Sequence, residues 1–291
     1  MLWGTGGLVV TVLNDDDGLG AMTVSAWRMA IAAAALLLFV AITGRLSRTW
    51  RTVRTHPAAV ALVGTGTALY QGLYFASVLL VGVSVATVVA LGLAPLLATV
   101  WEHVQARTKP SRGEVAVLGA ALTGLVLISA TAGHGSEGPG DNPALGLALA
   151  VASGGTYAAT TVLGHVLAQR VDPALLTTGA TVVGAFVLAP FFVVAAIASD
   201  PVLPASVEST ALLIYLGVAT MALAYGLLYA GLRTTSGSAA TVATLIEPLA
   251  AAVLAVLLLE ERLPWPALLG GMLILIAVAA LGREDGDLPP P

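Results

Sequence analysis

Charged side chains are scarce in this sequence. Only 10% of its 291 residues are charged, as 12 Lys+Arg and 16 Asp+Glu. A soluble chain of this length carries roughly 70 charged residues, at about 25% of its composition. So little charge cannot cover a water-facing surface, which excludes a soluble globular domain. It also excludes disordered and nucleic-acid-binding chains. The hydrophobic fraction of 58% indicates a helical membrane protein.

Cysteine is absent, and so are the usual patterns of enzymatic sites. Without thiols there is no disulfide scaffold, thiolate metal site or cysteine nucleophile. The sequence contains no Gly-x-Ser-x-Gly, no His-Glu-x-x-His and no aspartate pair within an apolar run. Its glycine-rich stretches lack the strand and lysine of a phosphate-binding loop. We therefore expect no catalytic residue, no metal site and no cofactor.

Long apolar runs divide the chain. A membrane-spanning helix needs about 20 mostly apolar residues, and turn or charge signals separate such runs here. We read residues 44–57 as a polar, arginine-bearing loop. The first run is short, so we expect a truncated first helix and a natural start codon upstream. The fold class predicted is an all-α polytopic membrane protein with ten transmembrane helices, near residues 2–13, 22–42, 58–79, 83–104, 114–132, 144–168, 174–197, 210–231, 237–259 and 265–282.

The few basic residues predict the orientation of these spans. With ten spans and the N-terminus inside, ten of the twelve Lys and Arg residues fall in cytoplasmic segments. The external loops then hold only Arg262, and Arg28 lies within the second span. Basic residues favour cytoplasmic loops. The sequence thus predicts an N-in/C-in, multi-pass protein of the bacterial cytoplasmic (inner) membrane.

Two stretches resemble each other at a separation of 153–155 residues. The first contains Tyr70-Gln-Gly-Leu-Tyr74, Ser84-Val-Ala-Thr-Val88 and Pro95, and the second contains Tyr225-Gly-Leu-Leu-Tyr229, Ser238-Ala-Ala-Thr-Val242 and Pro248. Their shared order and offset indicate a duplication. Because five spans are an odd number, the second copy would be inverted. We predict a first repeat at 1–133, an external linker at 134–143, a second repeat at 144–282 and a cytoplasmic tail at 283–291.

Short patterns add to this repeat, namely Trp3-Gly4, Ala26-Trp27-Arg28, Leu245-Ile-Glu-Pro248, Glu260-Glu261-Arg262-Leu263 and Gly270-Gly271. Together they resemble the EamA-type transporters of the drug/metabolite transporter (DMT) superfamily over almost the whole chain. Arg107 departs from the pattern, because the family often has a glutamate there. The resemblance implies two EamA repeats and transport of a small molecule, but it does not specify the substrate.

Glu247 is the sharpest candidate for a functional residue. It lies near the middle of the ninth apolar run, where a carboxylate costs about 2.5–3.5 kcal/mol on insertion scales. We predict that it binds substrate or carries a proton. The alternative is a carboxyl that hydrogen-bonds the backbone freed by Pro248. Pro95 and Pro248 are predicted helix kinks, since each removes a backbone donor within a span.

The other predicted cavity residues are aromatic or polar. Tyr70 and Tyr74 share one helical face, as do Tyr225 and Tyr229. Such faces suit amphipathic or cationic metabolites, and ordinary interhelical packing is the alternative. We interpret Arg28 as snorkelling outward or pairing with an acid, with anion recognition less favoured. The full set of predicted cavity residues is Trp3, Tyr70, Gln71, Tyr74, Tyr157, Tyr225, Tyr229 and Glu247.

These features together predict a secondary transporter that exports small metabolites or drugs by alternating access of two inverted repeats. Three alternatives stay open: an importer or exchanger of a sugar or nucleobase-like metabolite, a channel, and a membrane-embedded enzyme. The predicted partners are a small-molecule substrate and the lipid bilayer, with no nucleic acid. A homodimer also stays open.

Overall fold

Helices make up all the regular structure in the described part of the chain. The computed structural model describes residues 2–107, 109, 111–131, 142–168, 171–231, 247, 250, 254, 256–258 and 264–284. Every regular element there is helical, and no strand occurs among these residues. The predicted all-α class is therefore confirmed, whereas the count of ten spans and the orientation remain predictions.

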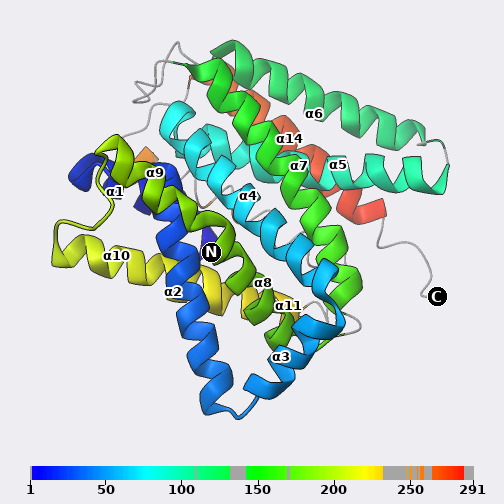
Figure 1. The fold of residues 1–291 in the computed structure, drawn as a ribbon. Helices are drawn as coiled ribbons and strands as arrows, with labels where there is room; N and C mark the ends of the chain where they lie inside the picture. Colours follow the sequence, from blue (N-terminus) through cyan, green and yellow to red (C-terminus); the bar gives the residue numbers. More distant parts are fainter. Residues whose placement is uncertain are drawn as a thin grey trace. The chain divides into compact units, whose positions relative to one another are not determined.

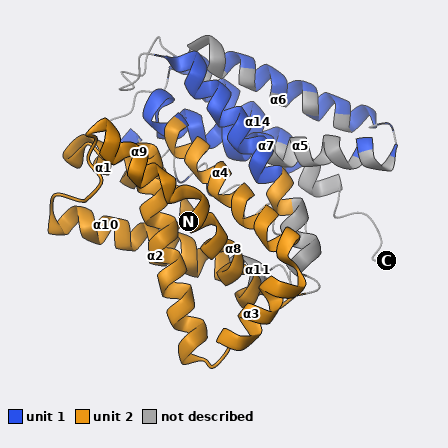
Figure 2. Cartoon of the chain, viewed as in Figure 1, with its two compact units in different colours: residues 1, 77–158, 235–291 blue, residues 2–76, 159–234 orange. Residues whose placement is uncertain are grey.

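The chain forms two compact units (Figure 2). Unit 2 comprises residues 2–76 and 159–234, and unit 1 comprises residues 1, 77–158 and 235–291. Each unit therefore combines a segment of the N-terminal half with a segment of the C-terminal half. Unit 1 takes the middle of the chain at 77–158 and its C-terminal part, and unit 2 takes the segment that precedes each of these. The compact units thus do not coincide with the two predicted repeats, which remain a prediction.

Unit 2 contains most of the described helices (Figure 1). Among the described residues, three stretches are long and apolar enough to cross a membrane, namely Ala21–Ile42, Pro173–Ala198 and Val207–Leu227. In chain order its elements are η1 (Trp3–Thr5), α1 (Gly6–Asp17), α2 (Ala21–Ile42), α3 (Leu46–Thr55), the first part of α4 (Pro57–Val81), the end of α7 (Pro143–Ala168), α8 (Pro173–Leu188), α9 (Pro190–Ala198), α10 (Val207–Gly217), the π-helix η2 (Val218–Leu223) and α11 (Ala224–Gly231).

Helix α2 packs against α8, α10 and η2 in the core of unit 2. Met29 is fully buried in this core, together with Leu176 and Met221. Glycines allow the backbones to approach closely. A Cβ on Gly64 of α4 would collide with the Ala180 carbonyl of α8, and a Cβ on Gly184 would lie 2.5 Å from the Met29 Cε. Small residues at helix contacts are typical of membrane helices, which associate by close packing.

Local signals set the ends of these helices. Gly18 ends α1 in a left-handed conformation, with φ of 68°. The Asp172 side chain accepts a hydrogen bond from the Ala174 N–H at the start of α8. The span predicted at 174–197 is divided into α8 and α9 at Pro190. A proline has no N–H to donate and clashes with the preceding turn, so the sequence carried the signal for this break.

The prediction of a loop at residues 44–57 is wrong. Residues Leu46–Thr55 form helix α3 there. The Thr49 side chain is buried, and Val53, one turn later, packs close to Gly179 of α8. The many arginines made the segment read as a solvated loop. The helix forms because Thr49 and Val53 give it one face that packs against α8.

Unit 1 contains α5 (Val83–Ala106), α6 (Arg112–Thr131), the first part of α7 and α14 (Trp265–Glu284). These helices also meet at glycines. A Cβ on Gly124 of α6 would lie 2.5 Å from the Gly270 carbonyl oxygen of α14, and one on Gly154 would lie 2.6 Å from the Ala90 carbonyl oxygen. Ile274 is fully buried in the apolar core of this unit. Most of the span predicted at 237–259 lies outside the described residues.

Candidate functional site

A buried arginine belongs to a polar and aromatic cluster in unit 2. Arg28 belongs to the apolar helix α2, and only 6% of its surface is exposed. Its Nη2 donates a hydrogen bond to the Thr220 carbonyl oxygen at 3.1 Å. Its guanidinium carbon lies 5.4 Å from the centroid of the Phe75 ring, within the range of a cation–π contact. A buried charge within an apolar helix is costly, and such residues mark functional sites.

The acceptor of this hydrogen bond belongs to an irregular turn. The π-helix η2 lies between α10 and α11. Thr220 is fully buried, and its hydroxyl donates to the Leu216 carbonyl at 2.7 Å. A Cβ on Gly217 would lie 3.1 Å from the Arg28 carbonyl, so the chain approaches α2 closely just before η2. Such π-turns are frequent at functional sites, because they displace backbone groups from the regular ladder.

Helix α4 contributes a second buried polar side chain. Gln71 is 1% exposed, and its Nε2 donates to the Ser25 carbonyl at 3.1 Å. Ser25 precedes Arg28 by one turn of α2, and Phe75 follows Gln71 by one turn of α4. The Ser25 hydroxyl is itself buried and has no hydrogen-bond partner within the described residues. The two helices thus face each other through polar and aromatic groups.

The first residues of the chain reach the same region. The Trp3 and Tyr225 rings meet edge to face, with centroids 5.0 Å apart. The indole Nε1 of Trp3 is buried and has no acceptor in the part of the chain that the structure describes. A Cβ on Gly6 would lie 3.8 Å from Phe75, so the start of α1 lies beside the ring that Arg28 covers.

An aromatic row continues along α4. The Tyr70 and Tyr74 rings stack with centroids 6.3 Å apart, and the Tyr74 and Phe75 centroids are 5.6 Å apart. Tyr74 is buried and Tyr70 half-buried. We call the polar and aromatic group of unit 2 the Arg28 cluster. Its members are Trp3, Ser25, Arg28, Tyr70, Gln71, Tyr74, Phe75, Thr220 and Tyr225.

Five of the predicted cavity residues therefore belong to the Arg28 cluster, and the others lie elsewhere. Glu247 is in unit 1, with 8% of its surface exposed, and Tyr157 is a half-buried residue of α7 in the same unit. Pro95 lies within α5, but its side chain and that of Tyr229 are outside the described residues, as is the whole of Pro248. The predicted kinks and the proton-coupling role of Glu247 remain predictions.

Three members of the cluster were missed or misread in the sequence. Of the two readings of Arg28, outward snorkelling is wrong, because its guanidinium is buried and binds the Thr220 carbonyl, whereas pairing with an acid remains a prediction. Phe75 carried a weak signal, since it directly follows the tyrosine pair. No local pattern distinguishes Thr220, because its role depends on a backbone carbonyl within a π-helical turn.

Comparison with known proteins identifies the family to which the chain belongs. A model of the EamA-like transporter family matches residues 1–130 and 144–283. The chain belongs to the EamA-like transporter family. The family expected from the sequence is therefore confirmed. The family and the apolar helices together indicate a membrane protein with a role in transport.

Two further proteins are similar to this EamA-like transporter. The "uncharacterized transporter YwfM" of Bacillus subtilis (strain 168) is 26% identical over 287 residues, which cover 97% of this chain and 92% of that protein. A protein of known crystal structure aligns with a TM-score of 0.64 at 19% identity, over 97% of this chain and 94% of its own. The structural likeness concerns the fold alone, whereas the name of the relative also points to transport.

Proposed function

We propose that this EamA-like transporter is a secondary transporter that exports a small metabolite or drug across the bacterial cytoplasmic membrane. The proposal includes ten spans with both termini in the cytoplasm and alternating access of two inverted five-helix repeats. Its substrate-binding residues come from the Arg28 cluster. The observation that carries this assignment is the burial of Arg28 within the apolar helix α2.

A buried guanidinium would not be retained in an apolar helix for packing alone, because a methionine fills a similar volume at lower cost. The groups around Arg28 are suited to a small amphipathic molecule. Trp3 and Ser25 each offer a buried polar atom with no protein partner within the described residues. The Tyr74 and Tyr225 rings offer apolar faces with hydroxyl ends. A ligand with one polar group and one apolar body would satisfy both kinds of surface.

Glu247 is the proposed proton carrier of this transporter. It is the only acidic residue near the middle of a predicted span, and its side chain is buried in unit 1. A carboxyl group in an apolar setting can exist as either the acid or the carboxylate, which is the property that proton-driven export requires. Import or exchange of a sugar or nucleobase-like metabolite is the second candidate, and it uses the same residues.

The proposal is tested first by a search for a ligand. The purified full-length protein is screened against a metabolite panel by thermal unfolding, because a ligand that binds only the folded state raises the apparent stability. We expect at least one hit that loses its effect in Arg28→Lys, which keeps the charge but not the planar fork. Arg112→Gln, at the exposed start of α6, is the control and should retain the effect. Equal shifts in all three proteins would overturn the assignment.

Transport is then measured with that ligand in reconstituted vesicles. A carrier gives saturable uptake that unlabelled ligand inside the vesicle accelerates, whereas a channel gives no such acceleration. Uptake driven by an inside-acidic gradient indicates proton antiport, which is the coupling that drives export. Uptake driven by an inside-alkaline gradient indicates proton symport, which is the coupling that drives import. Uptake that rises linearly with the external ligand concentration and is unaffected by ligand inside the vesicle would contradict a secondary transporter.

A further inference from the structure

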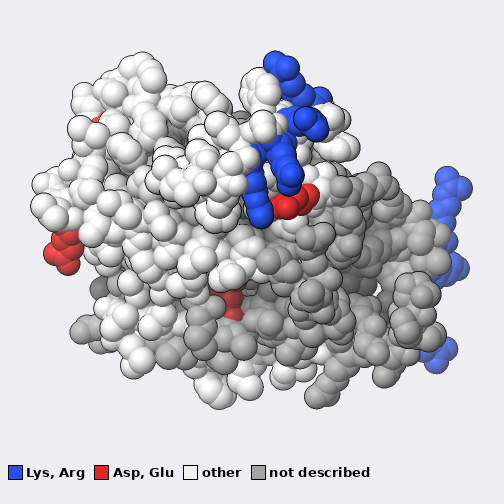
Figure 3. Space-filling view, turned by 90° about the horizontal axis from the view of Figure 1, so that it is seen from below, with Lys and Arg blue, Asp and Glu red and all other residues white. Residues whose placement is uncertain are grey.

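Helix α3 concentrates positive charge on one side of unit 2. Arg48, Arg51 and Arg54 are exposed along it, and Arg45 directly precedes it with 44% of its side chain exposed. Figure 3 views the molecule from the side on which α3 lies in Figure 1 and shows a group of Lys and Arg residues beside an acidic residue. Four arginines within ten residues are a third of all the basic residues in the chain.

The opposite face of α3 is fixed against the protein. Thr49 is 5% exposed, and its hydroxyl donates to the Arg45 carbonyl at 3.2 Å. The Val53 Cγ2 lies 3.0 Å from where a Cβ on Gly179 of α8 would be. Because Thr49 and Val53 pack against the protein, the orientation of α3 is fixed and its arginines remain on the outward faces.

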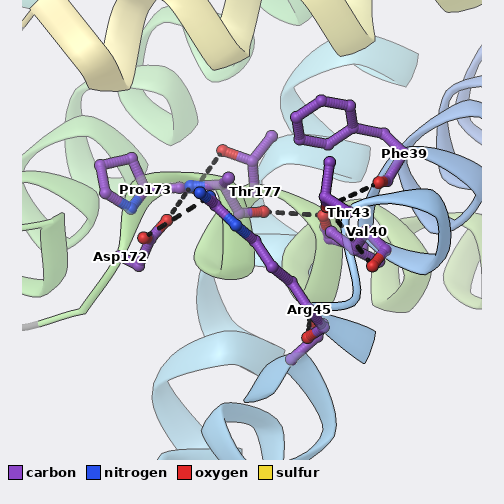
Figure 4. A network of polar contacts seen from close by, with 10 residues as sticks. Phe39, Val40, Thr43, Arg45, Asp172, Pro173 and Thr177 are labelled. Atoms are coloured by element: carbon purple, nitrogen blue, oxygen red, sulfur yellow. Dashed lines mark hydrogen bonds and ion pairs between the residues drawn. The ribbon is translucent and has the colours of Figure 1, made fainter. Parts of the chain in front are cut away.

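The Arg45 side chain already has a partner in the protein. Its Nη1 lies 4.0 Å from the Asp172 Oδ2, and both side chains are about half exposed. Figure 4 shows this pair between the α2–α3 junction and the start of α8. Asp172 also accepts from the Ala174 N–H at 2.9 Å. Within the described residues, Arg48, Arg51 and Arg54 have no such ion pair.

Apolar side chains lie beside these arginines. Leu46 is 50% exposed and Trp50, one turn later, is 59% exposed. The Arg54 guanidinium carbon lies 4.8 Å from the centroid of the Trp50 ring. Just before α3, the end of α2 also exposes Leu38, Phe39 and Ile42. An exposed tryptophan between an apolar helix end and a row of arginines is the arrangement found where a helix lies in a membrane interface.

We propose that α3 is an interfacial helix that binds the phosphate headgroups of anionic phospholipids through Arg48, Arg51 and Arg54. Leu46 and Trp50 enter the boundary between headgroups and acyl chains, which sets the depth of the helix. Guanidinium groups bind phosphate through paired charge-assisted hydrogen bonds, so they are suited to this headgroup. The negative surface of the cytoplasmic leaflet attracts such basic segments. The site contains no residue of the Arg28 cluster, so it does not depend on the proposed substrate site, but it rests on the proposed orientation, which places α3 on the cytoplasmic side.

The test measures thermal unfolding of the full-length protein in a neutral detergent, with added phosphatidylglycerol, phosphatidylcholine or inorganic phosphate. We expect phosphatidylglycerol to raise the melting temperature of the natural protein, and the other two to leave it unchanged. The triple variant Arg48→Gln, Arg51→Gln, Arg54→Gln should need at least about tenfold more phosphatidylglycerol for the same rise, because each basic residue contributes to binding at an anionic surface.

The matched control changes an equal number of charges elsewhere. Arg107, Lys109 and Arg112 are exposed around the α5–α6 connection, and replacing all three by Gln removes three positive charges without touching α3. This variant should keep the response to phosphatidylglycerol. Equal loss in both triple variants would overturn the proposal in favour of a general charge effect. An equal rise with inorganic phosphate would overturn it in favour of a site for a soluble anion.

A conservative variant guards against a triple variant that does not fold. Arg51→Lys keeps the charge of an exposed side chain but removes the planar fork, so it should fold and weaken the response to phosphatidylglycerol only partly. Arg51→Gln should weaken that response further. If both single variants respond as the natural protein does, α3 is not the lipid-binding helix.

Discussion

Arg28 of α2 and Thr220 of η2 are joined by a hydrogen bond of 3.1 Å from a guanidinium to a backbone carbonyl, across 192 residues of sequence. This bond connects an apolar helix of the N-terminal half to an irregular turn of the C-terminal half within unit 2. The same guanidinium lies over the Phe75 ring of α4. One charged side chain of α2 therefore contacts both η2 and α4.

Loss of this side chain should destabilise the folded protein. Arg28→Gln removes a charge-assisted hydrogen bond and leaves the buried Thr220 carbonyl without that donor, so we expect the free energy of unfolding to fall by about 2–3 kcal/mol. The free energy of unfolding should fall by less in Arg28→Lys, because the lysine ammonium can still donate a hydrogen bond. Thermal unfolding in detergent measures both. An Arg28→Gln variant as stable as the natural protein would show that the bond contributes nothing.

Close packing of α4 on α8 gives a second prediction. Gly64→Ala would place a methyl group against the Ala180 carbonyl of α8, so the helices must separate, at a cost of about 1–3 kcal/mol. Gly119→Ala on α6 is the control, because a Cβ there meets no described atom within 4 Å. We expect a lower melting temperature for Gly64→Ala and an unchanged or raised one for Gly119→Ala. The reverse order would contradict the packing described.

Asp172 has two roles that two substitutions can separate. Asp172→Asn keeps the oxygen that caps α8 but loses the ion pair with Arg45, which at half exposure is worth about 0–1 kcal/mol. Asp172→Ala loses the cap as well, which costs about 1 kcal/mol more. Thermal unfolding should rank the natural protein first, Asp172→Asn second and Asp172→Ala last. A variant with Asn less stable than the one with Ala would contradict the capping role.

The proposed proton carrier can be tested by removing its charge. Glu247→Gln should fold but lose the dependence of ligand flux on an imposed pH gradient, because an amide cannot take up and release a proton. Glu208→Gln is the control, since Glu208 is an exposed residue in the first turn of α10. Flux in reconstituted vesicles is compared at several pH gradients. A Glu247→Gln variant with unchanged pH-dependent flux would rule out this role.

The helices were largely predictable because each apolar run carries its own signal. The run at 22–42 corresponds to α2 at Ala21–Ile42, and the run at 58–79 corresponds to α4 at Pro57–Val81. The small helix α3 was not predicted, because the face that packs against α8 consists of only Thr49 and Val53 within an arginine-rich segment. When only two residues of a segment are packed, its arginine-rich composition predicts a solvated loop and hides the helix.

The Arg28 cluster was predictable only in part. Polar and aromatic side chains are conspicuous in apolar runs, so five members could be singled out: Trp3, Tyr70, Gln71, Tyr74 and Tyr225. Their arrangement around Arg28 could not, because it depends on tertiary contacts with Phe75 and with a carbonyl of η2. A π-helical turn has no established local pattern, and the helix packing that supports it forms only in the folded chain.

The most direct test of the account is exchange of a stabilising ligand by the reconstituted protein. Labelled ligand is placed outside vesicles that contain a high concentration of unlabelled ligand, and its uptake is followed for the natural protein, Arg28→Lys and Arg112→Gln. With external ligand below half-saturation, the account predicts rapid uptake for the natural protein and Arg112→Gln. Uptake should be at least about tenfold slower for Arg28→Lys, in which the loss of the planar fork costs about 1.4 kcal/mol or more of binding. Equal uptake by all three proteins, or no uptake beyond that of empty vesicles, would contradict it.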